Sequence, residues 1–220
     1  MDYKKYERIL NNIVHQAPLE CGVQALVYML LDEVISQQYT DGEIRVIVAD
    51  LRNNASVFGG KGGVPDLCIV DKEFIFVDKK VNAEEMVVQK KHRRGCVEVK
   101  AVKNVLRKRV KQLAGHIIEY GNVLYTNGLI WEYYCPTDLQ IQDIQTVLDG
   151  EKEKKIIDSK IVERLQVILQ NILENEKKDW PIHIGKKGAK ESDVFIIKSE
   201  FEKLEIKLAE INWENNRFKK

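Results

Sequence analysis

The chain has 220 residues, which is enough for one substantial hydrophobic core, and its formal net charge is +1. Its apolar runs are far shorter than the roughly 20 residues that cross a bilayer, and its charged opening segment lacks the apolar stretch of a secretory signal. We therefore expect a soluble cytoplasmic protein without a membrane partner. The four cysteines form no CxxC pair, which favours reduced packing residues over a zinc site.

The N-terminal quarter of the sequence has the pattern of helices followed by a strand. Apolar residues at helical spacing predict amphipathic helices over residues 3–14 and 19–37, and Glu20 lies in the first turn of the second helix. Residues 43–49 (EIRVIVA) predict a β-strand. Residues 58–64 (FGGKGGV) predict a glycine-rich connection, in which the backbone can approach a neighbouring group closely.

Two short apolar segments flank a long polar stretch in the middle of the sequence. Residues 65–70 (PDLCIV) predict a strand with Asp66 at its start, and residues 72–77 (KEFIFV) continue it as a hairpin. The polar residues 78–94 predict a mobile loop. Residues 96–101 (CVEVKA) predict the next strand.

The sequence after this strand predicts a helix and then a β-hairpin. Apolar residues at helical spacing predict the helix over residues 103–120. Strand patterns at residues 122–125 and 129–134 flank Asn127 and Gly128, the dipeptide that most readily supplies the positive φ angles of a tight turn. We therefore expect two antiparallel strands joined at this turn.

The composition becomes helical after Pro136. Thr137 and Gln140 have capping-box spacing, Gly150 is a predicted helix stop, and residues 151–155 predict a charged linker.

Beyond that linker we expect a helix over residues 156–176 and an irregular segment over residues 180–190. A last helix is predicted to open at Ser199 and Glu202, which again have capping-box spacing.

Positive charge is concentrated in one segment, residues 79–111. This segment contains twelve Lys and Arg against three Glu, a net charge of +9 that leaves −8 for the rest of the chain. Such a concentration suits a polyanionic partner because each neutralised phosphate releases bound counterions, although a solvated loop and helix face is the alternative. The candidate phosphate contacts are Lys90, Lys91, Arg93, Arg94, Lys103, Arg107 and Lys111.

Glu98 and Lys100 lie two residues apart in the predicted strand 96–101. Residues i and i+2 of a strand project from the same face, so the carboxylate and the ammonium lie side by side. An ExK triplet alone occurs often by chance. Its significance here comes from its surroundings, because a glycine-rich connection and Pro65-Asp66 precede it and a basic amphipathic helix follows it.

These residue types suit metal-dependent hydrolysis of a phosphodiester. Asp66 and Glu98 supply hard oxygen ligands, which Mg²⁺ and Mn²⁺ prefer, and the backbone carbonyl of Val99 is a further candidate ligand. Such a cation lowers the pKa of a bound water and neutralises charge that develops on the scissile phosphate. Lys100 would position or deprotonate the attacking water.

Pro65-Asp66 and Glu98-Val99-Lys100 resemble the signature of the PD-(D/E)xK nuclease superfamily. The predicted order of elements, which is helix, strand, PD hairpin, ExK strand, helix and strand, is similar to the order in that superfamily. The resemblance implies that Asp66 and Glu98 are metal ligands and that Lys100 is the catalytic lysine.

The resemblance covers residues 19–134 and implies a fold as well as a site. We expect an α/β, restriction-endonuclease-like core over residues 1–136, with a mixed β-sheet flanked by helices. Residues 137–220 are expected to form a C-terminal helical extension.

Two further residues enter through the resemblance. Many members of the superfamily carry an acidic residue on the first core helix near the metal, and Glu20 fits that place. Some carry a catalytic glutamine on the helix after the ExK strand, and Gln112 is similar to it. The chain differs in the 31 residues between Asp66 and Glu98, which is long for the family. An inserted basic loop would explain this length, and so would a chance match to the motif. His116 is interpreted as an ordinary residue at the edge of its helix.

The resemblance implies a metal-dependent endonuclease that prefers DNA to RNA, in bacterial or phage defence or restriction. Two other classes stay open. One is a catalytically silent nuclease fold that holds nucleic acid or a partner protein. The other is an interaction protein in which the C-terminal helices form a homodimer or bind a regulatory partner.

Overall fold

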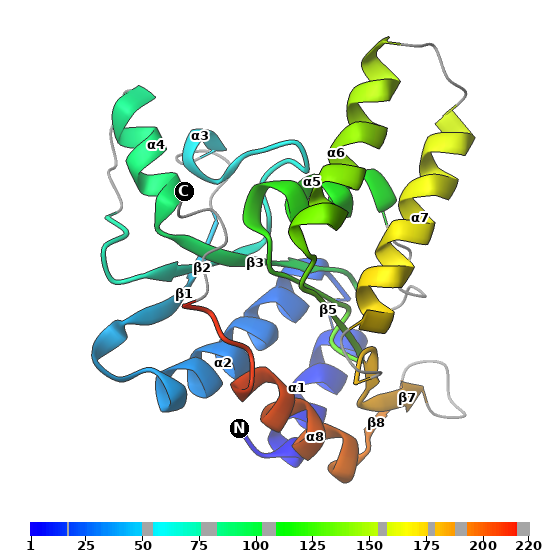
Figure 1. The fold of residues 1–220 in the computed structure, drawn as a ribbon. Helices are drawn as coiled ribbons and strands as arrows, with labels where there is room; N and C mark the ends of the chain where they lie inside the picture. The colour runs from blue at the N-terminus through cyan, green and yellow to red at the C-terminus, as the bar shows by residue number, and fades with distance from the viewer. Residues whose placement is uncertain are drawn as a thin grey trace.

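The computed structural model describes residues 1–16, 18–49, 55–75, 83–102, 109–153, 158–175, 179–187 and 193–214 (Figure 1). Its helices are α1 (Tyr3–Gln16), α2 (Glu20–Gln38), the 3₁₀ turn η1 (Thr40–Gly42), α3 (Ala55–Phe58), α4 (Ala83–Lys91), α5 (Val110–Tyr120), α6 (Asp138–Glu153), α7 (Asp158–Asn175) and α8 (Lys198–Ala209). Its strands are β1 (Ile44–Val48), β2 (Leu67–Asp71), β3 (Arg93–Val99), β4 (Val123–Thr126), β5 (Ile130–Tyr134), β6 (Ile182–His183), β7 (Gly185–Lys187) and β8 (Val194–Ile196).

A mixed six-stranded sheet runs through the molecule in the order β1-β2-β3-β4-β5-β6. Neighbouring strands are antiparallel except β3 and β4, which are parallel and are joined through α5. A parallel pair requires such a crossover, whereas antiparallel neighbours need only a turn. The α/β fold with a mixed sheet is confirmed, and the order α2, β1, β2, β3, α5 and β4 follows the predicted one. The prediction that residues 72–77 continue the Asp66 strand as a hairpin is wrong for the described residues 72–75, which form no strand, and β2 pairs with β1 and β3 instead.

Helices cover both faces of the sheet. Figure 1 shows α1, α2 and α8 on one side, and α5, α6 and α7 on the other. The central strands β2 and β3 are buried over their whole length because both of their faces are covered. Each fully buried aliphatic side chain in these strands favours folding by roughly 1.5–3 kcal/mol.

The pairing of β2 with β3 determines where the predicted motif lies. Leu67 lies opposite Val97 in this antiparallel pair. Continued by one residue, this register brings Asp66, which precedes β2, level with Glu98, in agreement with the hydrogen bond from the Val99 N–H to the Asp66 carboxylate. On the other side of β3, Glu98 pairs with Tyr125 of β4.

The hairpin of β4 and β5 turns where the sequence predicts it. Gly128 has a φ of 83°, and the side-chain oxygen of Asn127 accepts hydrogen bonds from the backbone N–H groups of Leu129 and Ile130 at 3.0 and 2.9 Å. Gly128 therefore contributes the positive φ of the turn, and Asn127 contributes the side-chain acceptor.

The prediction of a loop over residues 78–94 is wrong for the part that the structure describes. Residues 83–91 form α4, and β3 already begins at Arg93, while residues 76–82 lie outside the described residues. Helix α4 has no apolar stripe that would reveal it, but Glu84 and Glu85 lie in its first turn and Lys90 and Lys91 in its last. This arrangement complements the helix dipole.

The segment after Thr137 agrees with one capping prediction and departs from two others. The capping box is confirmed, because the Thr137 N–H donates to Gln140 Oε1 at 2.8 Å and the Gln140 N–H donates to Thr137 Oγ1 at 3.3 Å. Gly150 does not end α6, which continues to Glu153. Helix α8 begins at Lys198 after an Ile197 N-cap that makes no side-chain capping bond, so the second predicted capping box does not form.

Residues 180–190 are not irregular throughout, and they tie the C-terminal part to the sheet. Strand β6 pairs with β5 through Trp131 opposite Ile182, and β7 pairs with β8 in a separate two-stranded sheet. The expected helical extension therefore also contains strands. None of the described helices is both long and apolar enough to span a membrane.

Candidate active site

Asp66 is held at the start of β2 by contacts from three elements. Its backbone oxygen accepts hydrogen bonds from the Ala49 N–H at 3.2 Å and from the Gln24 side chain of α2 at 2.9 Å. Its side-chain Oδ2 accepts the N–H of Val99 at 2.7 Å. These bonds fix both the backbone and the carboxylate of Asp66 at the end of β3.

Glu98 is a buried carboxylate whose two oxygens are both engaged. Lys100 Nζ donates to Oε1 at 2.5 Å, and His116 Nε2 lies 3.2 Å from Oε2. Burial would raise the pKa of Glu98, but the hydrogen bonds from His116 and Lys100 outweigh it and lower the pKa below its ordinary value. The site therefore keeps Glu98 ionised.

The pKa of Asp66 is shifted in the opposite direction, upward. Burial, and then the charge of Glu98, raise the pKa of Asp66 to about 6, against the lowering effects of the Val99 N–H and of Lys100. Glu20 raises it further. The carboxylates therefore repel one another more strongly than Lys100 can offset, and additional positive charge near them would be favourable.

Lys100 lies among carboxylates and does not enter the apolar core. The Lys100 backbone N–H donates to the Thr126 backbone oxygen at 2.8 Å, which anchors Lys100 beside β4. Its ammonium is bonded to Glu98 and lies 3.7 Å from Glu20. Glu20 is the first residue of α2, and its side chain is 46% exposed. The structure thus brings Glu20, Asp66, Glu98 and Lys100 together, with the backbone of Val99 beside them.

The glycine-rich connection approaches a helix. Gly60 and Gly63 form a bridge with two backbone hydrogen bonds, of 3.1 and 3.0 Å. A Cβ on Gly115 of α5 would lie 2.3 Å from the Gly62 nitrogen, and a Cβ on Gly62 would lie 2.5 Å from the backbone oxygen of Gln112. The expected close approach of backbone is therefore between this hairpin and α5, just before Asp66.

Gln112 lies on α5 one turn before His116. Its side-chain oxygen is buried and has no hydrogen-bond partner among the described residues. Gln112 is therefore turned into the protein and away from a solvated helix flank, but no contact with Asp66 or Glu98 is seen in the described part of the chain.

His116 is a site residue that the sequence interpretation missed. Its side chain is fully buried and contacts Glu98. The signal available in the sequence was its position between Leu113 and Ile117, on the apolar side of a helix that packs on the ExK strand. A polar residue in such a place needs a partner, and here the partner is Glu98.

Arg93 and Arg94, predicted to contact phosphate, are buried and paired inside the protein. The Arg93 guanidinium lies 2.8 Å from Glu119 and 4.5 Å from the centre of the Tyr120 ring. Arg94 is bonded to Asp71 at the other end of β2. Their positions favour a structural role over contact with a nucleic acid.

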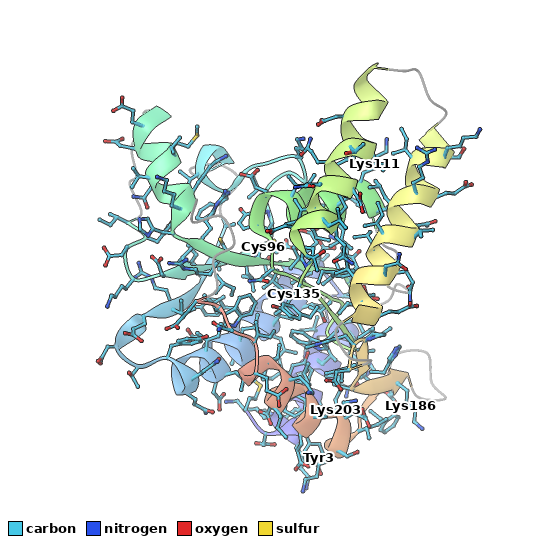
Figure 2. The ribbon with its side chains drawn as sticks, in the orientation of Figure 1. Tyr3, Cys96, Lys111, Cys135, Lys186 and Lys203 are labelled. Carbon is cyan, nitrogen blue, oxygen red and sulfur yellow. The ribbon has the colours of Figure 1, made fainter. Side chains whose placement is uncertain are left out.

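The lysines of the basic segment are more accessible. Lys90 is bonded to Glu119 at 3.0 Å with a side chain 30% exposed, and Lys91 is exposed at the end of α4. Lys111 lies in the first turn of α5 (Figure 2). Lys103 and Arg107 lie outside the described residues.

The carboxylates fit a particular kind of cation site. Among the described residues, no three His, Cys, Asp or Glu side chains form a group that could hold a metal ion. Mg²⁺ is often bound by only one or two carboxylates, with water and substrate phosphate as its other ligands. Asp66 and Glu98, with their oxygen donors and unbalanced charge, suit that open type of site and not an all-protein cage.

Comparison with protein-family models, characterised proteins and solved structures finds no match to this chain. The geometry of the site and the sequence motif are therefore the basis for a functional proposal.

Proposed function

We propose that the protein is a divalent-metal-dependent nuclease that hydrolyses phosphodiester bonds with Asp66, Glu98 and Lys100. The observation that carries the proposal is the meeting of three side chains where β2 begins and β3 ends: the Asp66 carboxylate accepts the N–H of Val99, the residue after Glu98, and Lys100 is bonded to Glu98. This cluster combines oxygen ligands for a hard cation with a partly buried ammonium. The resemblance to PD-(D/E)xK nucleases rests on these same residues.

In the proposed reaction each residue has a defined task. Asp66 and Glu98 would hold Mg²⁺ or Mn²⁺, with Glu20 and the Val99 carbonyl as additional oxygen donors. A cation held there would supply a water of lowered pKa and neutralise charge on the phosphate. Lys100 donates hydrogen bonds to the attacking water or to the phosphate oxygens, which orients the reactants. Gln112 is retained as a further candidate that acts from α5.

DNA is the proposed substrate, and restriction or defence is the proposed setting. Both follow from the family resemblance. The local support for a nucleic acid is the positive charge of Lys90, Lys91 and Lys111, which lie on the two helices next to β3 in sequence. Arg93 and Arg94 are left out of the proposed interface because Glu119 and Asp71 bind them.

A second candidate is a nuclease fold that binds nucleic acid without cutting it. The observation that favours it is the 2.5 Å contact between Lys100 and Glu98, which already gives the carboxylate a cationic partner. The two functions differ in metal dependence. A silent module would bind nucleic acid equally with and without divalent cations.

A titration of Mg²⁺ and Mn²⁺ with end-labelled single- and double-stranded DNA and RNA tests the proposal. We expect cleavage of at least one DNA substrate, dependent on the cation and abolished by EDTA. The RNA arms decide whether DNA is preferred. Absence of cleavage of every substrate, with binding unaffected by metal, would favour the silent module.

A further inference from the structure

His116 completes a clamp around the Glu98 carboxylate. Lys100 holds Oε1 and His116 holds Oε2, so both oxygens are bonded from different elements, β3 and α5. A carboxylate with one bonded oxygen can still rotate, whereas a carboxylate bonded at both oxygens has one orientation. His116 therefore determines how Glu98 presents its charge.

The glycine-rich connection, which Gly60 and Gly63 close into a hairpin, packs against His116. A Cβ on Gly62 would lie 2.6 Å from the backbone nitrogen of His116 and 2.7 Å from its Nδ1. A Cβ atom does not approach other atoms this closely in proteins, so the hairpin can pack against the imidazole only if residue 62 is glycine. On α5 itself, the ring of Tyr120 packs edge-on with its centre 6.2 Å from that of His116.

The hydrogen-bond pattern of His116 is costly for a residue that only fills space. Donation to the Glu98 carboxylate requires the proton on Nε2. Nδ1, the other ring nitrogen, is also buried, and it has no partner among the residues that the structure describes. An apolar side chain of similar size would fill the same space without an unpaired polar atom.

The same hairpin also leads directly to the second carboxylate. Asp66 follows Gly63 by only three residues, and Val99 holds its side chain at the end of β3. The packing of Gly62 on α5 therefore links the backbone before Asp66 to the histidine that orients Glu98.

We propose that His116, backed by Gly62, is a positioning residue that sets the orientation of Glu98 for a cation shared with Asp66. This inference rests on the proposed function. Partners that hold a ligating carboxylate typically change metal affinity by 10–100-fold when they are removed.

The test compares His116→Gln with His116→Asn. A glutamine amide can place an N–H near the position of the imidazole Nε2 and still reach Glu98, whereas the shorter asparagine amide ends near the position of Nδ1. Both variants keep a buried amide, so a role in space filling or general polarity predicts similar behaviour. Gly62→Ala tests the backing contact, and Gly150→Ala is its control because nothing lies within 4 Å of a Cβ there.

The readout is Mn²⁺ affinity of the nucleic-acid-free protein, measured by electron paramagnetic resonance, alongside cleavage rates. We expect His116→Asn and Gly62→Ala to bind Mn²⁺ about 10–100-fold more weakly than the parent. His116→Gln should recover most of that loss, and Gly150→Ala should match the parent. Near-ultraviolet circular dichroism checks the fold of each variant.

Parental Mn²⁺ affinity in His116→Asn would overturn the inference while leaving the proposed function intact. If His116→Asn does not fold, Gly62→Ala takes its place, and parental Mn²⁺ affinity in that variant would overturn the inference. A loss of Mn²⁺ affinity in His116→Gln equal to the loss in a folded Gly62→Ala would also overturn it. A parent protein that neither binds Mn²⁺ nor cuts nucleic acid would overturn the proposed function, and the inference with it.

Discussion

Asp66 combines two conditions that are unfavourable for an ionised carboxylate, burial and the nearby charge of Glu98, and its pKa is raised to about 6. Between pH ~4 and ~6 the folded protein therefore binds more protons at this residue than the unfolded protein does. Its contribution to the free energy of unfolding falls as the pH rises through this window and stays low above it. A shift of this size corresponds to at most about 3 kcal/mol.

Replacement of Asp66 by Asn should therefore stabilise the metal-free protein. Asn keeps an oxygen that can accept the Val99 N–H but carries no charge. In EDTA at pH 8 we expect Asp66→Asn to raise the free energy of unfolding by about 1–3 kcal/mol, with a smaller gain at pH 4. Denaturant unfolding at both pH values measures this. A loss of stability at pH 8, or the same gain at both pH values, would contradict the assigned pKa.

At the residue scale the sequence located the acidic cluster but not its full surroundings. Asp66, Glu98 and Lys100 were predictable because the period of a strand puts i and i+2 on one face and because a turn precedes Asp66. His116 was not, because its partner is 18 residues away and depends on how α5 packs on the sheet. Arg93 and Arg94 were misinterpreted for a related reason: Glu119 and Asp71 neutralise them only in three dimensions.

At the scale of elements, the start of β3 is a structural junction. Arg94 is buried with Asp71, and His92 Nδ1 lies 3.0 Å from the same carboxylate. The sequence showed this stretch only as part of a polar run. Burial of strand β3 from its first residue was therefore not predictable from local hydropathy.

Arg94→Met should reveal this structural role. The substitution leaves Asp71 buried beside a neutral side chain, and removal of one partner of a buried ion pair typically costs about 3–5 kcal/mol. We expect a loss of unfolding free energy of that order in urea titrations. Lys91→Met, at an exposed position on the neighbouring helix, is the control and should change stability by less than about 0.5 kcal/mol. Equal stability of the two variants would refute the distinction.

Helix α4 is the element to test for contact with nucleic acid. The double variant Lys90→Gln, Lys91→Gln should bind DNA more weakly than the parent in Ca²⁺. If both lysines contact phosphate, the slope of log affinity against log salt should become shallower by up to about 1.8. The loss should be similar for unrelated sequences because phosphate contacts carry little sequence information. An unchanged slope would show that α4 is only a solvated surface.

At the scale of the whole molecule, the C-terminal part is continuous with the core. Strand β6 extends the main sheet, α8 packs on α1 and α2, and Trp213 lies against β3, where a Cβ on Gly95 would be 2.6 Å from its ring. Local patterns predicted helices here but could not predict β6, since a two-residue strand is defined by its partner β5.

Truncation after Asn175 should therefore disrupt the fold and not release a stable core. It removes β6, α8 and Trp213, and exposes β5 as an edge along with the apolar surface under α8. We expect loss of the near-ultraviolet circular dichroism signal and of cooperative unfolding. A truncated protein that unfolds cooperatively near the parental midpoint would contradict this and would support a separable extension.

Single-turnover cleavage of labelled DNA in Mg²⁺ measures whether Asp66, Glu98 and Lys100 hydrolyse phosphodiester bonds. The comparison is between the parent, Asp66→Asn and Lys100→Met, with Lys72→Met as the control because Lys72 is an exposed lysine at the other end of β2. Binding of the same DNA in Ca²⁺ verifies that each variant still engages the substrate. We expect cleavage by the parent and Lys72→Met, and a loss of at least about 100-fold in Asp66→Asn and Lys100→Met with binding retained. Cleavage at the parental rate by either site variant would contradict this expectation.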